Sequence, residues 1–167
     1  MENFLFLQQC CKNKEIIVVL RDEKRKIAKM RQSEELLRHH GIRVTEIRKE
    51  IVETLLSRES ALSCKEIKEL IPGEFDRVTL YRTLNTFVEQ GIIHQIAGGE
   101  GTIRYALCSS GECVTHHHED RHIHFRCTAC GLTFCLEYHT PPKLEVPKGY
   151  KLGSFEISAT GLCKTCS

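Results

Sequence analysis

The stretch DRVTLYRTLNTFVEQGIIHQIAGGEGTIRYAL, residues 76–107, decides the fold. Its first half predicts a helix, because apolar side chains recur at helical spacing between an N-capping Asp76 and a C-capping Gly91. Its second half contains the β-branched runs 92–96 and 102–107, which are joined by a glycine-rich turn and predict a β-hairpin.

Three shorter helical signals precede this stretch. Residues 33–40 predict a short helix ended by glycine, and Thr45 can cap a helix whose apolar stripe runs over residues 47–56. The pattern Ser63-x-x-Glu66 is a capping box in front of a third helix, which Pro72 and Gly73 stop. Helices followed by a hairpin predict an α+β chain with an N-terminal winged helix-turn-helix over residues 30–107.

Length and composition limit the remaining possibilities. The 167 residues suit one compact domain or two small ones, and the ten cysteines and nine histidines are unusual. Residues 1–29 are interpreted as a leader, either flexible or upstream of a true start at Met30; they do not resemble a signal peptide. We therefore expect a cytoplasmic protein with no membrane segment, in which cysteines bind metal rather than form disulfides.

The composition changes after Leu107 to cysteine, histidine and short strands, which predicts a second domain over residues 108–167. Its strongest signal is the pair of motifs 127-CTAC-130 and 163-CKTC-166. Two residues between cysteines let both thiolates reach one ion, and two such knuckles complete a tetrahedral Zn²⁺ site. The predicted ligands of a structural zinc are Cys127, Cys130, Cys163 and Cys166; the alternative is a redox dithiol or unpaired core thiols.

A second constellation predicts a regulatory metal site. His122 and His124 alternate along a strand and share a face, His94 lies in the first wing strand, and Cys108 follows the second. Three imidazoles and one thiolate suit Zn²⁺ better than Fe²⁺ or Mn²⁺. Alternatively, His94 and Cys108 only pack while the other two histidines are exposed. Two further candidate ligands are His118, in a histidine-rich insertion, and Cys135, for which burial in a strand is the favoured alternative.

The helix of residues 76–90 carries a polar face opposite its apolar stripe. Thr79, Arg82 and Asn85 lie on that face and Tyr81 on its boundary, so they could contact phosphates and base edges. The alternative is an ordinary solvated helix. Residues 30–90 contain ten Lys/Arg and eleven Asp/Glu, so any affinity for DNA must come from where the cations lie and from their doubling in a dimer.

The chain resembles the ferric uptake regulator family from about residue 34 to residue 166. The resemblance is carried by VTEIR at 44–48, DRVTLYRTLNTFVEQGII at 76–93, HIHFRCTACG at 122–131 and the closing CKTC. It implies a winged helix followed by a small, zinc-containing, α/β or mostly-β dimerisation domain. It also implies a homodimer on a palindromic duplex operator, a DNA contact by Tyr81 and a phosphate contact by Arg48.

The resemblance also bears on the sensed metal. Zinc-responsive members supply ligands at positions matching His94, Cys108, His122 and His124, whereas iron and peroxide members usually supply a histidine where this chain has Ala61. It thus implies a zinc-responsive repressor of metal-uptake genes and not an enzyme, with an iron-, manganese- or peroxide-responsive regulator as the neighbouring alternative. A zinc hydrolase and a zinc-stabilised protein-interaction module are alternatives of other classes. The insertion after Ser109 and the segment 139–150 depart from the family, so details of the dimer interface are not carried over.

Overall fold

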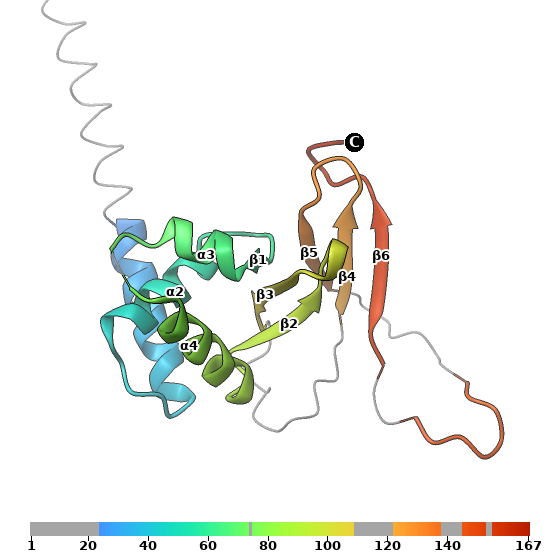
Figure 1. Ribbon diagram of the computed structural model, residues 1–167, viewed down its shortest axis with the longest axis horizontal. Coiled ribbons are helices and arrows are strands. Elements are labelled where there is room, and N and C mark those ends of the chain that lie inside the picture. The colour runs from blue at the N-terminus through green and yellow to red at the C-terminus, as the bar shows by residue number, and fades with distance from the viewer. Residues whose placement is uncertain (1–23, 74, 109–121, 138–144, 153–154) are drawn as a thin grey trace, which may run out of the picture.

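The computed structural model describes residues 24–73, 75–108, 122–137, 145–152 and 155–167. In the N-terminal half, a helix of residues 24–39 is followed by α2 (Glu46–Leu56), α3 (Cys64–Leu70) and α4 (Arg77–Glu89). The helices gather on one side of the molecule, and the strands of the C-terminal half lie on the other side (Figure 1). None of the helices in the described ranges combines the length and apolar character that a membrane crossing requires.

The predicted helix boundaries are confirmed at α3 and α4 and modified elsewhere. Ser63 accepts from the backbone N–H of Glu66 at 3.2 Å while the Glu66 carboxylate accepts from the Ser63 N–H at 2.6 Å, which completes the capping box. Asp76 caps α4 by accepting from the N–H of Thr79 at 2.9 Å. Thr45 occupies the N-cap position of α2, but its side chain makes no capping hydrogen bond.

The first helix is longer than predicted, because it begins at residue 24 rather than at residue 33. The apolar pattern begins only near Leu36 and Leu37, but lysine and arginine are good helix formers that extend a helix without an apolar stripe. Residues 24–29 therefore lie in this helix, whereas residues 1–23 lie outside the described ranges.

The predicted hairpin is confirmed as β2 (Ile93–Ala97) and β3 (Ile103–Leu107), joined by the 3-10 turn Gly99–Gly101. A short strand β1 (Leu62–Ser63) pairs with β3, so the sheet order is β1-β3-β2 with antiparallel pairings. Gly101 has a φ of +74°, which explains the glycine at the turn. Apolar residues of the helices and of this sheet form one core, which includes the fully buried Leu80, Leu84 and Phe87 of α4.

The C-terminal half is a second three-stranded sheet made of β4 (His122–Cys127), β5 (Thr133–Glu137) and β6 (Ile157–Gly161). β4 lies in the middle, antiparallel to β5 and parallel to β6. No helix occurs among the described residues after Leu107, so of the two predicted architectures the mostly-β one fits this part of the chain. The molecule as a whole has the α+β fold that the sequence predicts.

The two halves also touch through the segment that joins α2 to β1. Ser60, just before β1, forms an isolated β-bridge with Phe134 of β5. The N–H of Ala61 donates to the carbonyl of Thr133 at 2.8 Å, and Lys164 forms an exposed ion pair with Glu59 at 2.6 Å. We call this set of contacts the β1–β5 bridge.

Candidate metal centres

The four cysteines of the two knuckles come together at one end of the β4–β6 sheet. The donor sulfurs of Cys127, Cys130, Cys163 and Cys166 all lie within 4.8 Å of one another. Parallel pairing of β4 with β6 places Cys127 opposite Gly161, two residues before the second knuckle. Gly131, at φ +72°, turns the chain after the first knuckle. The structure thus brings together the four ligands predicted for a structural zinc.

Backbone N–H groups lower the pKa of some thiols in this cluster, and neighbouring sulfurs raise the pKa of others. Backbone N–H groups of Cys130 and Cys163 lower the pKa of Cys127 to about 6. The pKa of Cys163 is also lowered, first by the backbone N–H of Thr165. In contrast, the neighbouring Cys163 and Cys130 sulfurs raise the pKa of Cys166 to about 12. Crowded sulfurs resist a third and fourth negative charge, and a dication between them removes that resistance.

The second cluster lies where the wing meets the β4–β6 sheet. It consists of His94 from β2, His122 and His124 from β4, and Cys135 from β5, with donor atoms within 4.8 Å of one another. The Nε2 atom of His122 lies 3.1 Å from that of His94 and 2.8 Å from that of His124. All three imidazoles are buried, with exposed fractions of 5%, 8% and 3% for His94, His122 and His124. Three ring nitrogens directed at one point inside the protein fit a metal cation.

Cys135 completes this group of four donors, whereas the predicted Cys108 is not part of the group. Cys135 faces His124 directly across the β4–β5 ladder, so its side chain is on the same face, and its Sγ lies 3.3 Å from Nε2 of His94. The Cys108 Sγ instead lies 3.7 Å from Nδ1 of His94, on the other side of the ring. The assignment of Cys108 as a ligand stays a prediction, since its sulfur lies beside His94 but is not among the four grouped donors. The favoured alternative for Cys135, simple burial, does not describe its half-buried position beside three histidines.

Glu156 is a site residue that the sequence analysis missed. Its carboxylate accepts from Nδ1 of His124 at 2.5 Å. A carboxylate on the second nitrogen of a ligating histidine fixes the ring and directs the other nitrogen at the metal. The residue belongs to no motif, and only the parallel pairing of Ile157 with Ile123 brings it beside β4.

Two other metal-binding residue types fall outside these clusters as the structure describes them. His118 and the rest of the histidine-rich insertion lie outside the described ranges. Cys64 is half-buried and packs against the core of the N-terminal half.

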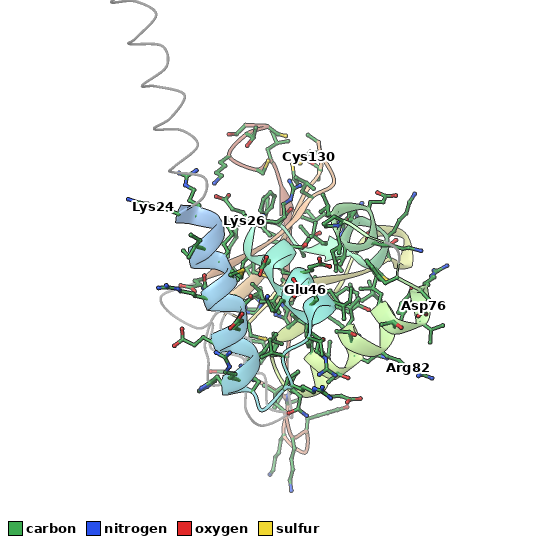
Figure 2. All side chains as sticks on the ribbon, turned by 90° about the vertical axis from the view of Figure 1, so that its left-hand side faces the viewer. Lys24, Lys26, Glu46, Asp76, Arg82 and Cys130 are labelled. Atoms are coloured by element: carbon green, nitrogen blue, oxygen red, sulfur yellow. The ribbon has the colours of Figure 1, made fainter. Side chains whose placement is uncertain are left out.

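The polar residues predicted on α4 are on its outward face. Thr79, Tyr81, Arg82 and Asn85 are exposed, and Figure 2 shows Arg82 projecting from the body of the protein. Tyr81 has an exposed fraction of 38%, which is high for so large an aromatic side chain. Arg48, on α2, is half-buried, and its guanidinium donates to the carbonyl of Arg43 at 2.8 Å.

Comparisons with known proteins agree with this architecture. The model of the ferric uptake regulator family matches residues 39–157. The zinc uptake regulation protein of Escherichia coli is 28% identical over 145 residues, covering 81% of this chain and 79% of its own. The peroxide operon regulator of Bacillus subtilis is 24% identical over 147 residues, covering 83% and 93%.

Solved structures show the same fold. A zinc uptake regulator complexed with zinc and DNA superposes with a TM-score of 0.60 at 25% identity, covering 82% of this chain and 91% of its own. The ferric uptake regulator of Vibrio cholerae superposes with a TM-score of 0.50 at 24% identity, covering 77% and 98%. With a family model that spans most of the chain and a matching fold, the protein belongs to the ferric uptake regulator family.

Proposed function

We propose that this chain is a zinc-responsive repressor of metal-uptake genes that binds a palindromic DNA operator as a homodimer. Its family membership makes it a metal-responsive transcriptional regulator. The finer statement concerns which metal is sensed and which residues carry the response.

One observation carries the proposal: the ligands of the second cluster come from both halves of the molecule. His94 belongs to the wing, whereas His122, His124 and Cys135 belong to the β4–β6 sheet. An ion held by all four connects the DNA-binding half to the other half. All four ligands of the Cys127 cluster come from the C-terminal half. An ion there would not connect the two halves, so this cluster suits a structural role.

The donor chemistry favours zinc. Imidazole and thiolate ligands suit Zn²⁺, while Mn²⁺ prefers carboxylate and water. Four protein donors also complete a tetrahedral shell, whereas catalytic zinc keeps one position for water or substrate. This argues for sensing rather than hydrolysis. A relative whose structure contains zinc and DNA gives independent support.

The response follows from geometry. Metal binding stabilises the arrangement in which the wing and the β4–β6 sheet approach each other, and it shifts the population only by its preference for that arrangement. In a dimer, the metal-stabilised arrangement of each chain fixes the distance between the two α4 helices. Helices that enter successive major grooves must lie about one helical turn apart, ~34 Å.

Tyr81 and Arg82 are the proposed base-reading residues, supported by Thr79 and Asn85. Arg48 is the proposed phosphate contact from α2. The exposure of the four α4 residues on one helix face supports the assignment of base-reading residues, and a major groove about 12 Å wide accepts such a helix.

The test begins by selecting a duplex from a random library with the zinc-loaded protein. Fluorescence anisotropy then follows binding while free Zn²⁺, Fe²⁺ or Mn²⁺ is varied by a metal buffer, with the Cys127 cluster kept loaded. We expect tight binding to appear at the lowest free concentration for Zn²⁺. Binding that responds to Fe²⁺ or Mn²⁺ and ignores Zn²⁺ would overturn the choice of metal.

A further inference from the structure

The face of β4 that carries two ligands of the second cluster also carries Arg126. Side chains alternate along a strand, so His122, His124 and Arg126 share one face of β4. The same face continues on β5, where Cys135 is paired with His124. The two histidines are buried, whereas Arg126 is exposed. One face of the β4–β6 sheet therefore runs from the metal cluster to the Arg126 guanidinium.

The wing, which consists of β2, β3 and the turn between them, meets this face at its base and at its tip. At the base, Nε2 of His94 lies 3.1 Å from Nε2 of His122. At the tip, the Arg126 guanidinium packs against Gly99. A Cβ atom built on Gly99 would lie 2.5 Å from Nη1 of Arg126, and closer still to Cζ and Nη2. So close an approach requires a residue without a side chain at position 99.

The backbone of Gly99 does not itself require glycine. Gly99 lies in a 3-10 turn without a positive φ, in contrast to Gly101 of the same turn, which has a φ of +74°. The turn is closed by hydrogen bonds. The Gly98 N–H donates to the Thr102 carbonyl at 2.7 Å, and the Thr102 N–H donates to the Gly99 carbonyl at 3.3 Å. A support under Gly99 therefore holds the whole tip of the wing.

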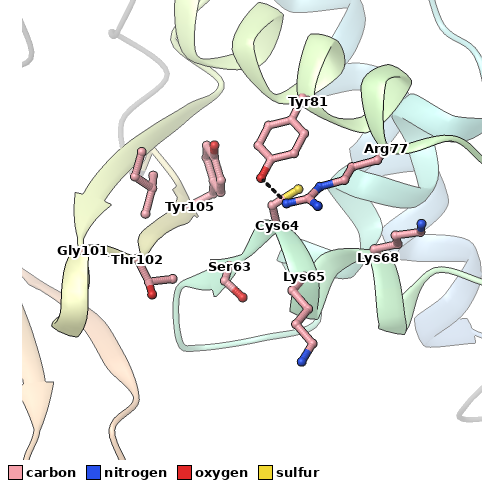
Figure 3. A pocket seen from close by; sticks show the side chains of 10 residues that line it. Ser63, Cys64, Lys65, Lys68, Arg77, Tyr81, Gly101, Thr102 and Tyr105 are labelled. Atoms are coloured by element: carbon pink, nitrogen blue, oxygen red, sulfur yellow. Dashed lines mark hydrogen bonds between the residues drawn. The ribbon is translucent and has the colours of Figure 1, made fainter.

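On the side of α4, the tip of the wing borders a cleft of about 580 Å³. Gly101 and Thr102 line this cleft from the wing, and Tyr81 lines it from α4 (Figure 3). The cleft separates the tip from the proposed base-reading helix, whereas the Arg126 contact joins the tip to the β4–β6 sheet. The C-terminal half therefore helps to set where the tip lies relative to α4.

We propose that Arg126 is a positioning residue that carries the state of the second cluster to the tip of the wing. The inference rests on the proposed zinc response. An ion that joins His94 to His122 and His124 fixes the base of the wing against β4. Arg126, two residues after His124, fixes the tip against the same strand, so the wing is held at two points. Without the guanidinium the ion still binds, but the tip takes several positions, and less of the metal's preference for one arrangement reaches DNA binding.

The experiment measures the gain in DNA affinity that zinc at the second cluster produces. Anisotropy is recorded with the selected duplex, with the Cys127 cluster loaded in every sample. Arg126→Ala should lower the gain by about 5-fold, an effect usual for residues between coupled sites. Zinc affinity without DNA should stay near the wild-type value, since Arg126 supplies no donor to the cluster. Metal analysis and circular dichroism check that the variant keeps both ions and its melting temperature.

A double-mutant cycle tests the contact itself. Gly99→Ala should displace the guanidinium and lower the gain as Arg126→Ala does, but it should have no effect when Arg126 is already replaced by alanine. Gly101→Ala is the matched control in the same turn. Its positive φ strains an alanine, and among the described residues nothing beyond its neighbours lies within 4 Å of the added Cβ. The effect of Gly101→Ala should therefore be the same with and without the Arg126 guanidinium.

A conservative variant separates the contact from the charge. Arg126→Lys keeps the positive charge but lacks the planar group that covers Gly99, so its gain should resemble that of Arg126→Ala. A wild-type gain in Arg126→Lys would show that charge alone suffices and would overturn the inference.

The remaining outcomes separate the two proposals. A wild-type protein whose DNA binding ignores zinc overturns the proposed function and this inference with it. A zinc response in wild type that Arg126→Ala leaves at full size overturns the inference alone. A Gly99→Ala effect of equal size in both backgrounds also overturns it, because the effect would not act through the guanidinium. Loss of an ion in Arg126→Ala would give the residue a structural role and would overturn it as well.

Discussion

The two candidate metal clusters of this protein differ in their donors, four thiols in one and three imidazoles with one thiol in the other, and they connect different parts of the chain. The Cys127 cluster joins two turns of one sheet, and its sulfurs are brought together by strand pairing within that sheet. In the His94 cluster, pairing of β4 with β5 brings three donors together, and the relative position of the two halves adds the fourth, His94. From this comparison we infer that the proposed roles of the two sites depend on which strands and turns supply the ligands.

The largest expected effect tests the dependence of one cluster on the other. Cys127→Ser removes a buried ligand, and structural zinc contributes an apparent ~10–16 kcal/mol of folding free energy, comparable with the stability of a whole domain. We expect the β4–β6 sheet to unfold and both ions to be lost, since β4 and β5 supply ligands to the second cluster. Metal analysis and circular dichroism measure this, with Cys64→Ser as the control. A folded variant that keeps the second ion would break the comparison.

The reverse substitution should be selective. His94→Ala removes the only ligand of the second cluster that comes from the wing, so we expect one zinc per chain to remain and the fold to persist. The zinc concentration needed for DNA binding should rise by more than about 100-fold. Loss of a residue that only hydrogen-bonds to a metal ligand usually has a smaller effect. Anisotropy under a metal buffer checks this. Unchanged zinc dependence would remove the second cluster from the response.

Cys135 and Cys108 provide a sharper test, because both sulfurs approach the same imidazole. With the Cys127 cluster loaded with zinc, Co²⁺ added to the second site should show a thiolate-to-metal band in wild type and in Cys108→Ser. The band should be absent in Cys135→Ser. We expect Cys108→Ser to weaken metal binding by about 10-fold, as an outer-sphere partner of His94. The opposite pattern of spectra would make Cys108 the ligand.

Glu156→Gln should have a smaller effect on the same site. The amide keeps an acceptor oxygen for Nδ1 of His124 but loses the charge that makes the ring a better donor. A decrease in zinc affinity of about 10-fold is expected, measured by competition with a chelator of known affinity. Glu145→Gln, on an exposed segment, is the matched control. Equal affinities for both variants would show that Glu156 does not orient the histidine.

The smallest expected effect concerns Glu66 in the N-terminal half, which belongs to neither candidate metal cluster. Burial acts to raise the pKa of Glu66, but hydrogen bonds from Ser63 and the nearby Arg104 outweigh it and lower the pKa below 4.5. The stabilisation is therefore fully present above pH 4.5 and is lost as the pH falls through the lowered value. Glu66→Gln should cost about 1 kcal/mol at neutral pH, similar to the loss of a helix cap. In urea unfolding, the difference from wild type should shrink below pH 4; a difference that grows with acid would reverse the assignment.

Local sequence signals predicted the helices and strands well, because capping and side-chain alternation depend on residues that are close in the sequence. The capping residues Ser63 and Asp76 and the alternation of His122 and His124 acted as expected. The fourth ligand could not be predicted the same way, since it depends on the register between β4 and β5, which places Cys135 opposite His124. Glu156 escaped notice for a related reason, because its neighbour across the sheet is 32 residues away. The cleft beside α4 also depends on packing between elements that the sequence separates.

The β1–β5 bridge has a mechanical consequence. The hydrogen bond from Ala61 to Thr133 and the bridge between Ser60 and Phe134 attach the N-terminal half to the β4–β6 sheet without any contribution from a metal. In the proposed function, an ion at the His94 cluster adds a second attachment between the N-terminal half and the β4–β6 sheet. Because the two halves are already joined, we expect metal binding to set their relative orientation rather than to bring separate bodies together.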